Sequence, residues 1–429
     1  MKKILVLHHY YRPDDVAGSV HFTGLCEGLA KRGWKVEIWP SNRSCHHYGD
    51  SYPTKLEVLE GVKVRRVYRP AWRQHSFLGR VANAAWVLSA WCWRALSSPS
   101  PDVVLTGTDP LFALAATPFF KWRFPKAKMV HWAFDLYPEY PIADGILREN
   151  TNLVRVIRAF LKKAYGACDL IVDLGPCMRE LLKKYPIKSR STLTPWAQEE
   201  PLEPLVPNLP ERKKLFGEAG LGLLYSGNFG RPHGFEQTLA LARRMRDKAV
   251  FAYSARGSRL EELKTRVEPQ DLNVKFVSFT APEKLAARLS APDIHIVSLM
   301  PHWRGVAVPS KFFGALAVGR PVLFEGDENS DIAGWIRKHK VGWVLTPQNL
   351  ESVREDLVDF SEDPWRKNDM FLHCHQVYQE HFSLKFIMDK WDQELRALFP
   401  ETVPVRRAEQ PRELAGNVRV PFFKTNSRR

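Results

Sequence analysis

The chain has 429 residues, which is too many for one hydrophobic core and predicts two domains. Hydrophobic residues make up 45% and charged residues 26%, as in ordinary folded proteins, and no run of eighteen uncharged apolar residues predicts a membrane-spanning helix. The six cysteines are scattered without a Cys-x-x-Cys pair, so neither a disulfide framework nor a zinc finger is expected. The apolar run after Lys3 is too short for a signal peptide, and we expect a cytoplasmic protein.

The charge of the chain is concentrated in its first half. Residues 1–190 contain 29 Lys and Arg against 16 Asp and Glu, which gives +13 of the total net charge of +16. Residues 216–370 are nearly neutral. This asymmetry predicts that only the first half meets a polyanion, which leaves nucleic acid, an anionic membrane surface or a phosphorylated substrate as candidates.

Short apolar runs alternate with helical stretches through residues 1–190. The expected strands are 3–7, 35–39, 62–68, 102–106, 128–132 and 169–174, and a helix is expected over 21–32, before Gly33. Continuous apolar strands separated by helices predict a parallel sheet covered on both faces.

Residues 191–215 are rich in proline and predict a linker, after which the alternation of strands and helices begins again. The second set of expected strands, within a domain at 216–375, is 221–226, 249–254, 274–277, 293–298, 321–325 and 341–345. A C-terminal helix is expected at 376–400 and a flexible basic tail at 401–429. The prediction is an α/β protein of two doubly wound domains with a cleft between them.

In such sheets ligands bind beyond the carboxyl ends of the strands. The first strand lacks the Gly-x-Gly-x-x-Gly pattern of a nicotinamide dehydrogenase, and neither a phosphate-loop motif nor a Gly-x-Ser-x-Gly elbow is found. Gly18 and Ser19 precede the first helix, where backbone could approach a phosphate or sugar; a simple turn is the alternative.

The loop after the first strand of the second domain is a candidate diphosphate cradle, with Gly227, Asn228, Gly230 and Arg231. Ser310 and Lys311 lie at an expected helix start, where a lysine beside the positive helix end indicates a bound anion. The alternative for Lys311 is an ordinary surface lysine.

Asp135 follows an expected strand among aromatic residues, so it could act as a base or bind a sugar hydroxyl, or it could cap a helix. The pairs His8-His9 and His46-His47 have no third partner at metal-ligand spacing, so no metal is expected. The stretch 77–96 carries three tryptophans, Trp86, Trp91 and Trp93, and fits either a core helix or a membrane interface.

Taken together, these motifs resemble glycosyltransferase family 4, and in particular the bacterial surface-polysaccharide branch. The resemblance covers residues 1–398 and is carried by the Gly18 loop, Gly33, the Asp135 motif, the 226–230 loop, and the segments 309–311 and 319–322. It implies the GT-B fold of two facing Rossmann-like domains, with a nucleotide-sugar donor on the second domain and the acceptor on the first. It also implies metal-independent transfer with retention of configuration, and a final helix that crosses back to the first domain.

The chain departs from the family pattern at the donor site. Val306 and Gly314 occupy the positions of a glutamate pair found in much of the family, and Asn228 and His233 replace two basic residues. Lys311, with Arg231 or Arg304, is expected to supply the phosphate charges, and Glu325, or Asp327 or Glu328 beside it, to bind ribose.

The predicted function is sugar transfer to a lipid-linked acceptor in cell-surface polysaccharide biosynthesis, by a hexosyl- or N-acetylhexosaminyltransferase. The protein is expected to lie peripherally on the cytoplasmic membrane face and to bind an anionic membrane surface but no nucleic acid. A membrane site is placed at the arginines between 65 and 94, including Arg65, Arg66 and Arg69. The alternatives are a nucleotide-sugar 2-epimerase of the same fold and a non-catalytic basic protein that binds membranes or nucleic acid.

Overall fold

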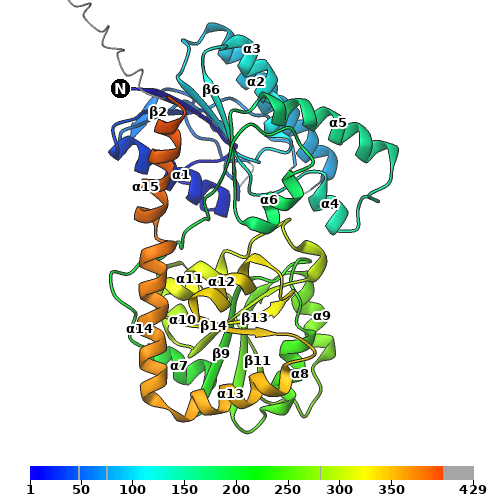
Figure 1. The fold of residues 1–429 in the computed structure, drawn as a ribbon, viewed down its shortest axis with the longest axis vertical. Coiled ribbons are helices and arrows are strands. Elements are labelled where there is room, and N and C mark those ends of the chain that lie inside the picture. Colours follow the sequence, from blue (N-terminus) through cyan, green and yellow to red (C-terminus); the bar gives the residue numbers. More distant parts are fainter. Residues whose placement is uncertain (47–48, 74–75, 281, 400–429) are drawn as a thin grey trace, which may run out of the picture. The chain divides into compact units, whose positions relative to one another are not determined.

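The computed structural model describes residues 1–46, 49–73, 76–280 and 282–399, and Figure 1 shows its two sheets. The tail predicted at 401–429 lies outside the described residues. Residues 1–398 form a single unit by their contacts.

The first sheet has eight strands in the order β3-β4-β2-β1-β5-β6-β7-β8, parallel except for β3. Its elements and the connecting helices are β1 (Lys3–Leu7), α1 (Ala17–Lys31), β2 (Lys35–Ile38), β3 (Glu57–Leu59), β4 (Val62–Val64), α2 (Phe77–Ser97), β5 (Val103–Thr106), η1 (Ala113–Ala116), α3 (Thr117–Arg123), β6 (Lys128–Trp132), α4 (Glu139–Ala143), α5 (Asn152–Ala167), β7 (Leu170–Asp173), α6 (Pro176–Leu182) and β8 (Arg190–Thr192). The central strands β5 and β7 are buried along their whole length, which explains their continuous apolar runs.

The second sheet is parallel throughout, with six strands in the order β11-β10-β9-β12-β13-β14. Its elements are α7 (Leu209–Phe216), β9 (Leu221–Asn228), α8 (Glu236–Arg244), β10 (Ala249–Arg256), α9 (Ser258–Arg266), β11 (Val274–Val277), η2 (Pro282–Lys284), α10 (Leu285–Ser290), β12 (Ile294–Leu299), η3 (Pro301–Trp303), α11 (Lys311–Ala317), β13 (Val322–Gly326), α12 (Asp331–His339), β14 (Gly342–Leu345), α13 (Leu350–Glu362), α14 (Pro364–His381) and α15 (Leu384–Ala397). Every strand expected from the sequence is present in one of the two sheets.

The C-terminal stretch forms two helices where the sequence analysis expects one. Ser383 separates them, because its side chain accepts a hydrogen bond from the backbone N–H of Phe386 and so caps the start of α15. Helix α14 contacts α11 of the second half, whereas α15 contacts α1 of the first half. The chain therefore returns to the first sheet at α15, beside α1 (Figure 1).

Candidate functional site

One pocket of about 400 Å³ is lined by residues from both halves of the chain. The first half contributes loops at the carboxyl ends of β1, β5 and β6, and the N-terminus of α1. The second half contributes residues immediately before α11, including Ser310. This is where a doubly wound sheet is expected to bind a ligand.

Asp135 lies in this pocket, three residues after β6. Burial raises the pKa of its carboxyl to about 6, and the negative charge of Asp109 adds to the shift. The carboxyl is therefore ionised at neutral pH but takes up a proton near pH 6, which suits a group that accepts a proton from a hydroxyl. The predicted catalytic residue is thus placed at a ligand-accessible position.

Asp109 follows β5 and lines the same pocket as Asp135. Desolvation opposes its ionisation, but His9, which hydrogen-bonds to it, and the positive charge of Arg69 outweigh that effect and hold the pKa of Asp109 below its usual range. The His9 Nδ1 atom lies 3.3 Å from Oδ1 of Asp109 and donates to it. Asp109 thereby stays charged and keeps the pKa of Asp135 raised.

His8 forms another wall of the pocket, directly after β1. Its Nδ1–H donates to the backbone oxygen of Tyr10 at 2.8 Å, and its ring stacks on Phe22 at a centroid distance of 4.0 Å. Burial lowers the pKa of His8, so the neutral ring presents Nε2 as an acceptor. Gly18 makes room for this ring, because a Cβ there would lie 3.2 Å from Nε2.

Ser19, predicted with Gly18 to contact a ligand, is fully buried. Its hydroxyl donates to the backbone oxygen of Asp14 at 2.9 Å and so stabilises the turn before α1. Gly18 lines the pocket, whereas Ser19 faces the protein interior.

Lys311 and the loop at the end of β9 are brought together, as the sequence predicts for a diphosphate cradle. The Lys311 Nζ atom donates to the backbone oxygen of Asn228 at 3.1 Å and lies 5.1 Å from the centroid of the Tyr225 ring. Gly227 has φ +124°, and a Cβ there would come within 2.8 Å of Lys311 Cε, so this position requires glycine. Burial lowers the pKa of Lys311 to about 8.

Ser310 lies between Lys311 and the pocket that contains Asp135. It is exposed, lines the pocket that contains Asp135, and precedes Lys311 in the chain. Its side chain makes no capping hydrogen bond to α11. A ligand bound at Lys311 can therefore extend past Ser310 toward Asp135.

Glu325, predicted to bind ribose, lies at the end of β13 with its carboxylate against the start of α8. Its two oxygens accept hydrogen bonds from the backbone N–H groups of Gln237 at 3.1 Å and Thr238 at 2.9 Å. Phe235, at the N-cap position, offers no capping side chain, so Glu325 caps the helix from another strand. Burial raises the pKa of Glu325.

Arg231 connects the loop at the end of β9 to the first half. Its Nη1 atom lies 3.1 Å from the carboxylate of Asp144, which follows α4. A second contact joins the backbone N–H of Cys177, at the start of α6, to the carboxylate of Asp331 at 3.0 Å. Gly230 lies in the same loop as Arg231. A Cβ added to it would have room, because the nearest atom beyond the adjacent residues is 3.6 Å away.

Asp109 is a pocket residue that the sequence did not predict, and His8 was considered only as a metal ligand. Both follow strands, β1 and β5, that are neighbours of each other in the sheet, and β6 with Asp135 comes next. The rule that selected Asp135, a polar residue at the carboxyl end of a strand, would also have selected them.

Within the part of the chain that the structure describes, one group of side chains could hold a metal ion. It consists of Asp15, Cys45 and His46, whose ligand atoms all lie within 4.8 Å of one another. His47, paired with His46 in the sequence analysis, lies outside the described residues. That the protein needs no metal stays a prediction.

Known sequences show which family the chain resembles. Residues 18–195 match the sequence model of Glycosyltransferase Family 4. A Pseudomonas aeruginosa protein named "Probable glycosyltransferase WbjE" is 27% identical over 263 residues, which cover 58% of this chain and 63% of that protein. The chain thus matches less than two thirds of the length of this relative. The predicted resemblance to glycosyltransferase family 4 is confirmed.

Two solved structures show the fold. The Anabaena protein HepE, solved with UDP and glucose, has a TM-score of 0.63 and 12% identity, covering 92% of this chain and 100% of that chain. WaaG, a glycosyltransferase involved in lipopolysaccharide biosynthesis, has a TM-score of 0.59 and 17% identity, covering 91% and 99%. The predicted GT-B fold, with two Rossmann-like domains, is confirmed.

Proposed function

We propose that this protein is a glycosyltransferase that moves a sugar from a nucleotide-sugar donor to an acceptor hydroxyl. The observation that carries the proposal is the shared pocket, in which Asp135 of the first half meets Ser310, next to Lys311, of the second. The name of WbjE and the UDP and glucose bound to HepE support the same reaction.

In the proposed reaction the donor diphosphate lies against Lys311 and the backbone of residues 227–230. The acceptor oxygen forms a bond to the anomeric carbon on the same face from which the diphosphate departs, as the bond from that carbon to the diphosphate breaks. Lys311 stabilises the charge that develops on the leaving group, because a cation is most effective where charge increases. Asp135 accepts a hydrogen bond or the proton from the attacking hydroxyl. By family resemblance, the reaction retains the anomeric configuration and needs no metal.

The proposed acceptor is a lipid-linked glycan, and the proposed process is cell-surface polysaccharide biosynthesis. The basic first half and the role of WaaG in lipopolysaccharide biosynthesis support this assignment. The transferred group is proposed to be a hexose or an N-acetylhexosamine. The protein would act peripherally at the cytoplasmic face of the membrane, with no nucleic acid as partner.

A thermal-shift screen of nucleotide sugars identifies the donor, and transfer of the radiolabelled sugar to a lipid extract then tests the reaction. We expect one nucleotide class to raise the melting temperature of the wild type and of Asp135→Asn alike, and only the wild type to label lipid at full rate. A protein that is stabilised by no nucleotide sugar would contradict the proposal.

A nucleotide-sugar 2-epimerase is a second candidate, because the pocket collects the groups such an enzyme needs around one sugar. His8, His21, Asp109 and Asp135 all line it. An epimerase would convert its nucleotide-sugar substrate without any acceptor. Incubation of UDP-N-acetylglucosamine with the protein alone, followed by chromatography of the nucleotide sugars, separates the two functions.

A further inference from the structure

Helix α3 contacts both α2 and α5 beside the first sheet, and Figure 1 shows where the three helices lie. The charged residues within these helices all carry the same sign. Together they contain eight Lys and Arg and no Asp or Glu. Helix α13 of the second half shows the contrast, since it contains five acidic residues and one arginine. The outer surface of α2, α3 and α5 is named the α2–α3–α5 face below.

The α2–α3–α5 face also exposes large apolar side chains. They are Leu78, Val81, Trp86, Trp93 and Leu96 of α2, Trp122 of α3, and Leu153, Val156 and Phe160 of α5. On α2 and on α5 these positions recur at the spacing of one helix side. Trp93 is 79% exposed and Trp122 is 70% exposed, so this water-facing side is apolar where a soluble helix is usually polar.

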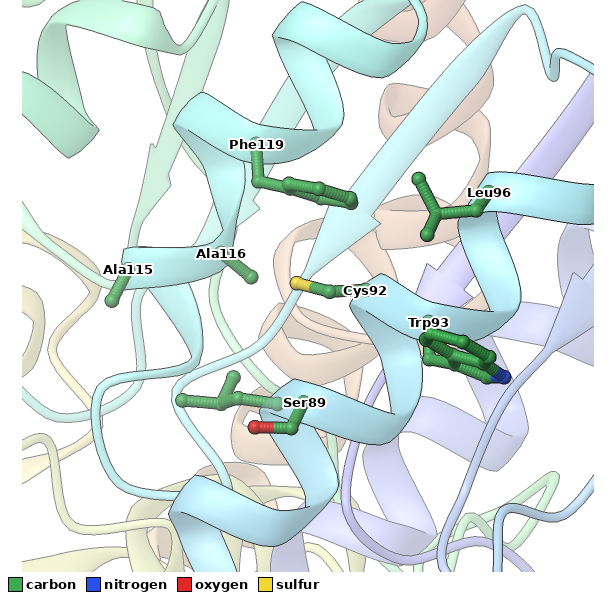
Figure 2. A pocket seen from close by; sticks show the side chains of 8 residues that line it. Ser89, Cys92, Trp93, Leu96, Ala115, Ala116 and Phe119 are labelled. Atoms are coloured by element: carbon green, nitrogen blue, oxygen red, sulfur yellow. The ribbon is translucent and has the colours of Figure 1, made fainter.

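An apolar groove of about 400 Å³ crosses this face between α2 and the segment formed by η1 and α3. Leu88, Cys92, Trp93 and Leu96 form one wall, and Ala115, Ala116 and Phe119 form the other. Figure 2 shows the sulfur of Cys92 directed from α2 toward Ala116 and Phe119. Ser89 is the one polar residue of the lining.

The groove lies close to the candidate site, because η1 separates the two. Ala115 and Ala116 line the groove, while the preceding residues Ala113 and Leu114 line a second, smaller pocket that contains Asp135. Leu161 of α5 also lines this smaller pocket. A lipid chain in the groove would therefore lie one short helical turn from the residues around Asp135.

We propose that the α2–α3–α5 face binds the surface of an anionic lipid bilayer, and that the groove takes one hydrocarbon chain. This proposal rests on the proposed function, in which the protein acts at a membrane, and it identifies the surface that contacts that membrane. Among the described residues no helix has the length and apolar composition to cross a bilayer, so the helices would lie in the interface.

The occupant follows from charge and composition. Anionic headgroups attract the exposed basic residues of these helices, including Arg155, Lys162 and Lys163. Tryptophan is favoured at the depth where hydrocarbon meets water, which fits Trp93 and Trp122. The structure also relocates the site that the sequence suggested: Arg66 is 2% exposed and Arg69 is fully buried, so neither can face a headgroup.

Sedimentation with vesicles tests the face directly. Full-length protein should pellet with phosphatidylglycerol-containing vesicles, pellet at least fivefold less with pure phosphatidylcholine, and be released as salt rises. The double variant Trp93→Glu/Leu96→Glu should reduce pelleting at least tenfold. Trp365→Glu is the matched control, because Trp365 is 82% exposed on α14 and should leave pelleting unchanged.

Alkylation of Cys92 tests the groove. Cys92 and Cys177 are both half-buried, and Cys177 lies on α6, away from the groove. Anionic vesicles should slow maleimide labelling of Cys92 at least fivefold and leave Cys177 unchanged, as measured by peptide mass spectrometry. Equal protection of both cysteines, or none at Cys92, would overturn the assignment of the groove.

The remaining outcomes concern the occupant. Equal pelleting of the Trp93→Glu/Leu96→Glu variant and wild type would overturn the proposal, as would a lipid-free dimer that this variant alone dissociates. Nucleotide binding and transfer to a water-soluble acceptor are measured on the wild type and the same variants. If the wild type binds nucleotide and transfers sugar but does not bind vesicles, the membrane inference is wrong and the transferase function stands. If it binds vesicles but no nucleotide, the transferase function is wrong.

Discussion

At the scale of single residues, the candidate site depends on two carboxyl groups with different surroundings. Asp109 is held ionised by His9 and Arg69, whereas burial and the charge of Asp109 raise the pKa of Asp135 to about 6. Two nearby carboxyl groups whose pKa values are driven apart can take different roles, one as a fixed charge and one as a proton acceptor.

Replacing Asp135 by Asn removes the charge and keeps the shape. We expect the transfer rate to fall at least tenfold, because general-base groups contribute about 10²–10⁴-fold to rate. Nucleotide affinity, measured by calorimetry, should change less than twofold. A variant with wild-type activity would show that Asp135 has only a structural role.

The pH profile gives an independent check of the same carboxyl. If ionised Asp135 is the base, activity should be low below pH 6 and rise as pH increases through about 6. Asp109→Asn removes the neighbouring negative charge, so the pKa of Asp135 should fall and the rising limb should move to lower pH. If the rising limb of the pH profile does not move in Asp109→Asn, the charge of Asp109 does not raise the pKa of Asp135.

Lys311→Ala should weaken binding of the donor nucleotide about tenfold to a hundredfold, because a hydrogen bond to a charged group is worth about 1.5–3 kcal/mol. The pKa of Lys311 is about 8 in the free protein, so wild-type affinity should also decline as pH rises above 8 and the ammonium loses its proton. Calorimetry at pH 7 and pH 9 measures both effects. An affinity that is the same in Lys311→Ala and wild type would remove Lys311 from the donor site.

Single residues also show where sequence reasoning stops. Asp135 and Lys311 could be selected because they follow strands or begin a helix, and the fold places Asp135 in the pocket and Lys311 next to Ser310 at its edge. Ser19 and Glu325 have equally suitable types and positions, but the hydroxyl of Ser19 is buried against Asp14, and both oxygens of Glu325 accept hydrogen bonds from α8. Whether a polar group has an internal partner depends on distant segments, which the local sequence does not show.

At the scale of elements, Gly227, near the end of β9, and Gly314, within α11, differ in the room that each has for a side chain. Gly227 has φ +124° and lies under the side chain of Lys311, whereas an added Cβ at Gly314, inside α11, would meet no atom within 4 Å. Gly227→Ala should lower the melting temperature and weaken nucleotide binding, since Lys311 must move. Gly314→Ala should stabilise the protein by about 0.5–1 kcal/mol, the usual gain in a helix. Scanning calorimetry measures the stability of both variants. An equal change in melting temperature would contradict the difference in space at Gly227 and Gly314.

The elements that the sequence could not predict are short or polar. The strand β3 has three residues, none of them buried, and β8 has three residues with polar side chains at the edge of the sheet. Neither gives the continuous apolar run that identifies a central strand. The break at Ser383 was missed because apolar positions on both sides of it continue a helical pattern, while the cap itself is a single serine.

At the scale of the whole molecule, the C-terminal helix α15 completes the core of the first half. Trp391 of α15 is fully buried and packs edge-on against Trp132 at a centroid distance of 5.2 Å. Trp132 in turn contacts Phe134, the neighbour of Asp135, at 4.5 Å. Residues separated by more than 250 positions thus support the wall of the pocket that contains Asp135.

Trp391→Ala should therefore destabilise the first half by about 3–5 kcal/mol, the usual cost of removing a buried tryptophan. Transfer should slow as the Phe134 wall loosens, whereas nucleotide affinity should stay within twofold, because Lys311 and its loop belong to the second half. Scanning calorimetry and isothermal titration measure the two effects. Trp365→Ala, at an 82% exposed position on α14, should change stability by less than about 0.5 kcal/mol. A parallel loss of nucleotide affinity in Trp391→Ala would mean that α15 supports both halves of the chain and not the first half alone.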